Sequence, residues 1–127
     1  MKAANISGKW QEGTNWVKLS LPVMVFEEEG SQIAYIPVLD LSGCGTNENE
    51  AIDSLKIALD DYFSYTTRKK TLAEDLKKHG WTIKKKSKPF VAPEITDILN
   101  KNEYLHEIVN TRPYKMDRMS VNVPTYA

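Results

Sequence analysis

The sequence contains little cysteine and no long hydrophobic run. Cys44 is the only cysteine among 127 residues, so no disulfide can form within the chain, and a cytoplasmic setting is the natural expectation. The longest apolar stretches are far shorter than the roughly 20 residues of a membrane-spanning helix. The N-terminal stretch MKAANISGKW also lacks the basic and then apolar layout of a signal peptide. We therefore expect a cytoplasmic protein without a membrane partner.

The chain also lacks net charge, because 17 basic side chains balance 17 acidic ones. This balance argues against a domain that depends on contacts with nucleic-acid phosphates. The charges are nevertheless segregated: residues 27–61 hold nine acidic residues and one basic residue, whereas residues 68–88 hold nine basic and two acidic residues. Such a chain could bind a charged partner through either surface, or form a homodimer by charge complementarity. Two solvated surfaces of opposite charge are the alternative interpretation.

Apolar segments bounded by turn residues predict β-strands in the first third of the chain. NWVKLSLPVMVFEEEG is rich in Val, Leu and Phe, and Pro22 within it indicates an edge position, a bulge or the start of the paired part. SQIAYIPVLD follows the turn at Gly30 and completes a hairpin whose second strand should end near Pro37. LDLSGCG is then extended as a third strand, and ISGKWQ ahead of the hairpin is a candidate partner strand.

The clearest local pattern predicts a helix from Asn47 to about Tyr65. Asn47 and Glu50 form a capping box, in which the Asn side chain caps the first turn and Glu50 reaches back to the backbone N–H of the cap. Small alanines in the apolar stripe would let this helix approach a sheet closely. The stripe follows helical spacing and consists of Ala51, Leu55, Ala58, Leu59 and Tyr62.

A second helix is predicted from Thr71. Thr71 and Glu74 form another capping box, and Gly80 is suited to a left-handed C-cap. WTIKKK, residues 81–86, then alternates as a short strand with one charged face.

The remaining segment is predicted to be an appendage. SKPFVAP is typical of a linker because of its prolines, and Pro93 is suited to the first position of one or two short helices. DRMSVNVPTYA predicts a final strand that stops at Pro124, and this strand could complete the sheet of a neighbouring protomer. We expect a core domain over residues 1–88 and a C-terminal helical segment and strand over residues 89–127.

The GCGTN stretch raises the question of an active site. A Cys44 nucleophile needs a nearby base, and the only histidines, His79 and His106, lie on helices that carry lysine or glutamate. One cysteine and two histidines at such wide spacing are also weak evidence for a zinc site. A phosphate cradle would require a P-loop lysine, and Glu48 and Glu50 would repel the anion. We expect this stretch to begin a helix, with no catalytic residue, metal site or cofactor.

The basic stretch RKKTLAEDLKKHGWTIKKKSK offers a nucleic-acid-binding alternative, with Trp81 available to stack on a base. The other interpretation places the lysines in solvent and Trp81 in the core. The candidate nucleic-acid-binding residues are Arg68, Lys69, Lys70, Lys84 and Lys86.

The stretch YIPVLDLSGCGTNENEAIDSLKIAL resembles the signature of the HicB-like antitoxin family, in which a strand ending in Pro and a Gly-Cys turn lead into a helix. Cys44 and Gly45 are adjacent here, so the loop before the helix is shorter than is usual in that family. Many relatives end in a DNA-binding domain, of which this sequence shows no recognisable copy. The matching positions are Pro37, Gly43, Cys44, Gly45, Glu50 and Ala51, with Asn47 in place of the usual Thr cap.

The resemblance implies an α+β fold with a partial RNase H-like β-β-β-α-β core, in which a helix packs against a mostly antiparallel sheet. Nuclease chemistry on such a fold needs carboxylates that converge on a metal, one of them in the first strand, and LPVMVF holds none. We therefore expect no enzyme, and the resemblance implies an antitoxin that binds and occludes a small basic HicA-type mRNA interferase. An orphan interaction scaffold of the same fold is a further alternative. The candidate partner-binding acidic face consists of Glu27, Glu28, Glu29, Asp40, Asp60 and Asp61.

Overall fold

The structure, a computed structural model, describes residues 16–83 and 90–124. Within these ranges the chain is a mixed α+β protein with a four-stranded antiparallel sheet and four helices, so the expected α+β class is confirmed. The predicted strands within residues 6–11 and 84–86 lie outside the described residues. The elements in chain order are β1 (Trp16–Glu28), β2 (Ser31–Ile36), β3 (Leu41–Gly45), α1 (Glu48–Lys69), α2 (Leu72–Lys78), β4 (Thr82–Ile83), β5 (Phe90–Val91), α3 (Ile95–Leu99), α4 (Glu103–Thr111) and β6 (Tyr114–Pro124).

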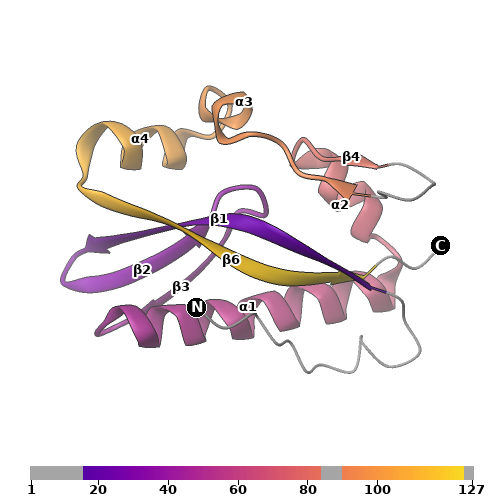
Figure 1. Cartoon of the computed structure of the whole chain (residues 1–127), viewed down its shortest axis with the longest axis horizontal. Coiled ribbons are helices and arrows are strands. Elements are labelled where there is room, and N and C mark those ends of the chain that lie inside the picture. The colour runs from indigo at the N-terminus through magenta and orange to yellow at the C-terminus, as the bar shows by residue number, and fades with distance from the viewer. Residues whose placement is uncertain (1–15, 84–89, 125–127) are drawn as a thin grey trace.

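The main sheet has the strand order β3-β2-β1-β6, and every pair is antiparallel. β6 pairs with β1 from Trp16↔Pro124 to Phe26↔Tyr114, although the two strands lie at opposite ends of the chain (Figure 1). The predicted final strand is therefore confirmed, and its partner is β1 of the same chain. Pairing of β1 with β2 begins only at Met24, so Pro22 is paired with β6 alone. The missing N–H of Pro22 costs no ladder hydrogen bond if it faces the side of β1 that has no partner strand.

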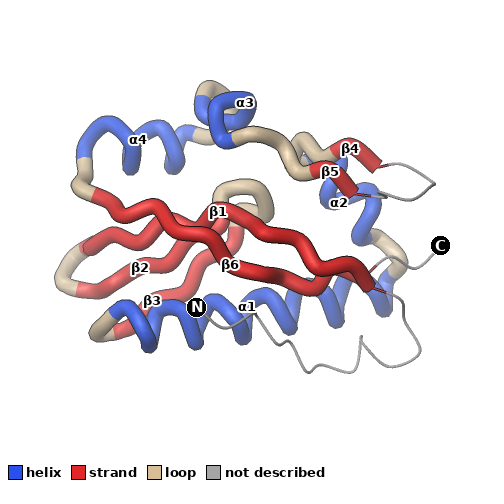
Figure 2. Tube along the Cα trace, in the orientation of Figure 1, coloured by secondary structure: helices blue, strands red, loops and turns tan. Residues whose placement is uncertain are grey.

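Helices cover both faces of this sheet (Figure 2). Successive side chains of β1 point to opposite faces, because a strand has a period of two. Leu21 and Val23 belong to the cluster packed on α1, whereas Met24 and Phe26 belong to a second cluster formed with α4. The core is therefore split by the sheet into a large layer against α1 and a smaller layer against α4.

Helix α1 begins as predicted and ends later. The Asn47 side chain accepts a hydrogen bond from Glu50 N at 2.9 Å, which confirms the cap. Glu50 reaches back to Thr46 N at 2.9 Å and not to the N–H of Asn47, so that part of the predicted capping box is wrong by one residue. The helix continues four residues past Tyr65, because the buried Thr66 keeps the apolar stripe on the core and the chain turns only at Lys70, which has φ 59°.

The segment after α1 departs further from the prediction. Thr71 makes no side-chain capping hydrogen bond, so the capping box expected with Glu74 is wrong, whereas Gly80 does adopt the left-handed conformation, with φ 90°. The strand at β4 pairs with β5 in a separate two-stranded sheet, so Phe90–Val91 is a strand where we expected a linker. The helix predicted to begin at Pro93 begins at Ile95.

Candidate functional site

Gly43 and Gly45 of β3 let this strand pack closely against α1. Gly43 of β3 is buried, and a Cβ atom placed there would lie 2.2 Å from Leu55 N and 2.5 Å from Ala51 O. A Cβ atom at Gly45 would lie 2.4 Å from Glu50 Cβ. Such distances are shorter than any real Cβ contact, so only glycine lets the strand and the helix backbone approach this closely. Gly43 and Gly45 therefore have a structural role at the contact between β3 and α1.

Cys44 is exposed between the two glycines, and its backbone N–H donates to Ser54 Oγ at 3.2 Å. The histidines make other contacts: His79 Nδ1 lies 2.8 Å from Asp75 O, and His106 contacts Asn110. In the ranges 16–83 and 90–124, no three His, Cys, Asp or Glu side chains are placed to hold a metal ion. Cys44 therefore lies in strand β3, opposite Ile33 of β2, and not in the Gly-Cys turn that the resemblance implied.

The six residues of the expected acidic face do not gather in one place. Residues 27–29 lie at the turn between β1 and β2, whereas Asp40 follows β2 at its other end, where it accepts a hydrogen bond from Tyr35 at 2.6 Å. A strand of this length separates the two groups by roughly 20 Å. Asp60 and Asp61 lie on α1, three turns beyond its start.

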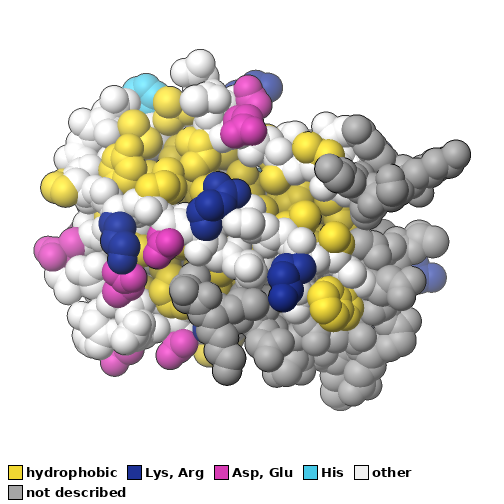
Figure 3. Space-filling view, in the orientation of Figure 1, with side chains coloured by type: hydrophobic (Ala, Val, Ile, Leu, Met, Phe, Trp, Pro, Cys, Tyr) yellow, Lys and Arg dark blue, Asp and Glu magenta, His cyan; other side chains and the backbone are white. Residues whose placement is uncertain are grey.

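A different set of carboxylates lies at one end of the sheet. Glu27 is opposite Gln32, and Gln32 is opposite Gly45, so the β1–β2 turn and the start of α1 lie at the same end of the sheet (Figure 1). Acidic side chains are visible at this end in the space-filling view (Figure 3). We call this set the acidic end, and it consists of Glu27, Glu28, Glu29, Glu48 and Glu50.

Basic side chains neutralise only part of the acidic end. Arg112 contacts Glu28 at 3.3 Å, and Lys115 contacts Glu48 at 3.0 Å. The Glu50 carboxylate accepts hydrogen bonds from the backbone N–H and from the hydroxyl of Thr46. These two bonds, the backbone one most of all, lower the pKa of the Glu50 carboxyl. The acidic end therefore keeps a negative charge at neutral pH. Sequence reasoning missed Glu48 and Glu50 as members, although the predicted helix start and the hairpin register together could have placed them there.

The candidate nucleic-acid-binding residues lie at the other end of α1. Arg68 and Lys69 are in its last turn, Lys70 is its C-cap, and all three are exposed. Lys84 and Lys86 lie outside the described residues. Trp81 is buried with 4% of its surface exposed, so it packs in the core and is not available to stack on a base.

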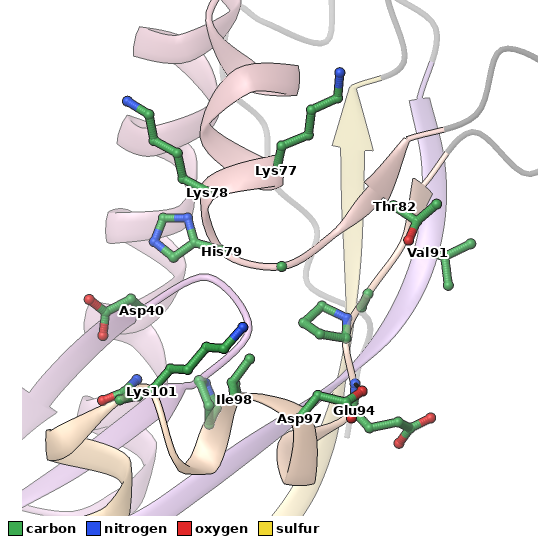
Figure 4. A pocket seen from close by; sticks show the side chains of 15 residues that line it. Asp40, Lys77, Lys78, His79, Thr82, Val91, Glu94, Asp97, Ile98 and Lys101 are labelled. Carbon is green, nitrogen blue, oxygen red and sulfur yellow. Dashed lines mark hydrogen bonds between the residues drawn. The ribbon is translucent and has the colours of Figure 1, made fainter.

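A cleft of about 750 Å³ lies between the end of α2, the β4–β5 pair and α3 (Figure 4). Basic residues of α2 line one side, but Lys77 and Lys78 point away from its centre (Figure 4). Asp40, Glu94 and Asp97 contribute carboxylates to the same lining. The mixture of charges does not converge on one class of ligand.

The buried Tyr35 and the partly buried Tyr104 pack between α4 and the sheet. Tyr35 donates to Asp40 Oδ1 at 2.6 Å and accepts from Asn102 Nδ2 at 2.8 Å, while Asn102 also caps α4 by accepting from Leu105 N. The ring of Tyr104 meets that of Tyr35 edge to face at 5.1 Å. Burial, followed by the hydrogen bond to Asp40, raises the pKa of Tyr35 above its ordinary value. Burial and the charge of Glu28 raise the pKa of Tyr104 to about 12.

We predict that these tyrosines make the protein sensitive to alkali. Their pKa values are higher in the folded chain than the value near 10 of an unfolded tyrosine. Their contribution to the free energy of unfolding is therefore complete below about pH 10 and is lost as the pH rises toward 12. The free energy of unfolding, measured by urea titration at each pH, should fall more steeply over this range in the wild type than in Tyr35→Phe. Tyr65→Phe, at an exposed position, is the control and should keep the wild-type slope. Equal slopes in all three proteins would contradict the prediction.

A scan of protein-family models found no match to this chain, and searches of curated proteins and of solved structures found none either. Over residues 16–83 and 90–124, none of the helices is both long and apolar enough to cross a membrane.

Proposed function

We propose that this chain is a non-catalytic, HicB-like antitoxin that binds a small basic mRNA interferase of the HicA type and occludes its active site in the cytoplasm. The acidic end is the observation that carries this proposal. An enzyme that cuts RNA must attract phosphates, so its active site is basic, and a group of carboxylates at one end of the sheet is complementary to it. The resemblance of residues 35–59 to the family signature adds support, because this segment contains the junction of β3 and α1 that puts Glu48 and Glu50 at the same end of the sheet as the hairpin turn.

The acidic end could speed the encounter with a basic toxin as well as form contacts with it in the complex. Glu27 and Glu29 are exposed at the hairpin turn, where they can be approached without rearrangement of the sheet. Glu28 and Glu48 contact Arg112 and Lys115, and each carboxylate remains partly exposed. Complementary charge speeds the encounter of two proteins and excludes partners of the wrong sign. The chain would thus compete with RNA for the basic surface of the toxin.

Reversing charge at the acidic end should weaken binding to the toxin. In Glu27→Lys/Glu29→Lys, two carboxylates that would face basic groups become like charges, and we expect the affinity for a co-expressed HicA-type toxin to fall by about tenfold or more at low salt. The measurement is a calorimetric titration of purified toxin at two salt concentrations. The matched control is Asp61→Lys/Glu74→Lys, which makes the same change in net charge at exposed positions of α1 and α2. If both double variants lose affinity equally, or neither does, the acidic end is not the binding surface.

Binding of nucleic acid is a second candidate, favoured by the exposure of Arg68, Lys69 and Lys70 together at the junction of α1 and α2. An affinity for RNA that falls steeply with salt would support this candidate, since release of counterions drives such binding. No binding of RNA or DNA at low salt would exclude it. An interaction scaffold without a toxin is the outcome if the chain binds neither.

A further inference from the structure

The outer edge of β6 is open among the described residues. β6 is the terminal strand of the sheet, and its first five residues, Tyr114–Arg118, are all exposed, whereas the rest of the strand is mostly buried. Tyr114 and Met116 expose 41% and 46% of their surfaces, which is unusual for large apolar side chains on a strand. An edge with exposed apolar residues is a template for pairing with another strand.

The β1–β6 register indicates which backbone N–H and C=O groups of β6 point outward at this edge. Pro22 is opposite Arg118 in the β1–β6 register, and a proline has no N–H to donate across the pair. The Arg118 N–H donates instead to the carboxylate of its neighbour, Asp117, at 2.8 Å. The N–H and C=O of Arg118 therefore point away from β1, and the alternation of a strand gives Met116 and Tyr114 the same outward direction.

The exposed sequence Tyr-Lys-Met-Asp-Arg is complementary to itself when it is reversed. We propose that β6 pairs antiparallel with β6 of a second copy of this chain, about a twofold axis at Met116. Lys115 then lies opposite Asp117 of the second copy and exchanges its contact with Glu48 for this one, and the same pair repeats across the axis. Tyr114 lies opposite Arg118 of the second copy, where a guanidinium can stack on the phenol ring.

Backbone and side chains agree on this register. Tyr114, Met116 and Arg118 direct their backbone groups outward, so the pairing would form about six interstrand hydrogen bonds. Pro113 falls opposite Met119 of the second copy, at a position where the missing N–H is not needed. Ser20 already holds the Arg118 guanidinium through bonds of 2.8 Å and 2.7 Å, so less side-chain freedom is lost on pairing. Asp117 would exchange the N–H of Arg118 for the ammonium of Lys115.

Charge reversal at the paired positions tests this dimer on the full chain. The wild type should elute as a species of about 29 kDa, twice the 14.5 kDa of one chain, when its mass is measured by light scattering in a concentration series up to about 1 mM. Asp117→Lys places two cations opposite each other, and Lys115→Asp places two anions opposite each other, so each variant alone should be monomeric. Mixed in equal amounts, the two variants regain opposite charges at both pairs and should form a heterodimer. Asp61→Lys, at an exposed position of α1, is the control and should remain dimeric.

Two results would overturn the proposal. One is a monomeric wild type over the whole concentration series, and the other is a dimer that persists in Asp117→Lys, which would place the interface elsewhere. Far-ultraviolet circular dichroism shows whether each variant is folded, and heterodimer formation in the mixture requires that both are. The proposal does not depend on the antitoxin function, because no toxin is present in the experiment.

Discussion

Gly43→Ala should destabilise the fold severely, by about 3 kcal/mol or more. The added Cβ would lie 2.2 Å from Leu55 N and 2.5 Å from Ala51 O, both of which are backbone atoms of α1. A flexible side chain could move aside, but a helix backbone can yield only if the whole helix shifts away from the sheet. That shift would open the core between β3 and α1. Urea unfolding followed by circular dichroism measures the free energy, and we expect a large fall in the midpoint.

Gly30→Ala is the matched control for this substitution. Gly30 has φ 83°, and nothing lies within 4 Å of a Cβ atom placed there, so alanine should cost only the left-handed backbone strain of about 1 kcal/mol. If Gly43→Ala is no more destabilising than Gly30→Ala, then α1 does not pack on β3 as closely as the structure shows.

Trp81→Ala should be comparably destabilising, with an expected loss of about 3–5 kcal/mol. Trp81 is 4% exposed, and its indole N–H donates to Val38 O at 2.7 Å, which connects residues 43 positions apart. Its ring also meets Phe90 edge to face at 6.5 Å, so it links the β4–β5 pair to the turn after β2. Removing the ring leaves a cavity and an unsatisfied carbonyl. Chemical denaturation at neutral pH provides the measurement.

Trp81→Phe separates the two parts of this loss. Phenylalanine keeps most of the buried area but cannot donate to Val38 O, so we expect a smaller loss of about 1–3 kcal/mol. Trp16→Ala is the control, since Trp16 is 48% exposed, and it should change the free energy of unfolding by far less. Equal losses in Trp81→Ala and Trp16→Ala would contradict the buried position of Trp81.

The sequence predicts those parts of the fold that depend on neighbours along the chain. The hairpin follows from two apolar runs around Gly30, and the start of α1 follows from the Asn47 cap, because both depend on residues within one turn. The capping box at Thr71 failed although its residue types are right, because residue type alone does not place the Thr side chain against the first turn of α2. Local patterns thus locate elements better than they locate individual hydrogen bonds.

Long-range pairing was not predictable in the same way. The final strand was recognised, but nothing local shows that its partner is β1, nearly a hundred residues earlier, or that β4 pairs with β5 outside the main sheet. The residues of the predicted acidic face are divided for the same reason: Asp40 is close in sequence to the hairpin turn but lies at the far end of β2. Only the strand register shows that Glu48 and Glu50 lie at the same end of the sheet as Glu27.

Inhibition of RNA cleavage is the most direct test of the antitoxin proposal. The purified chain is added in increasing amounts to a HicA-type toxin from the same source, and cleavage of a defined RNA is followed with time. We predict that cleavage stops near an equimolar ratio, and that Glu27→Lys/Glu29→Lys requires a clear excess to achieve the same effect. Undiminished cleavage in the presence of excess folded chain would contradict the proposal.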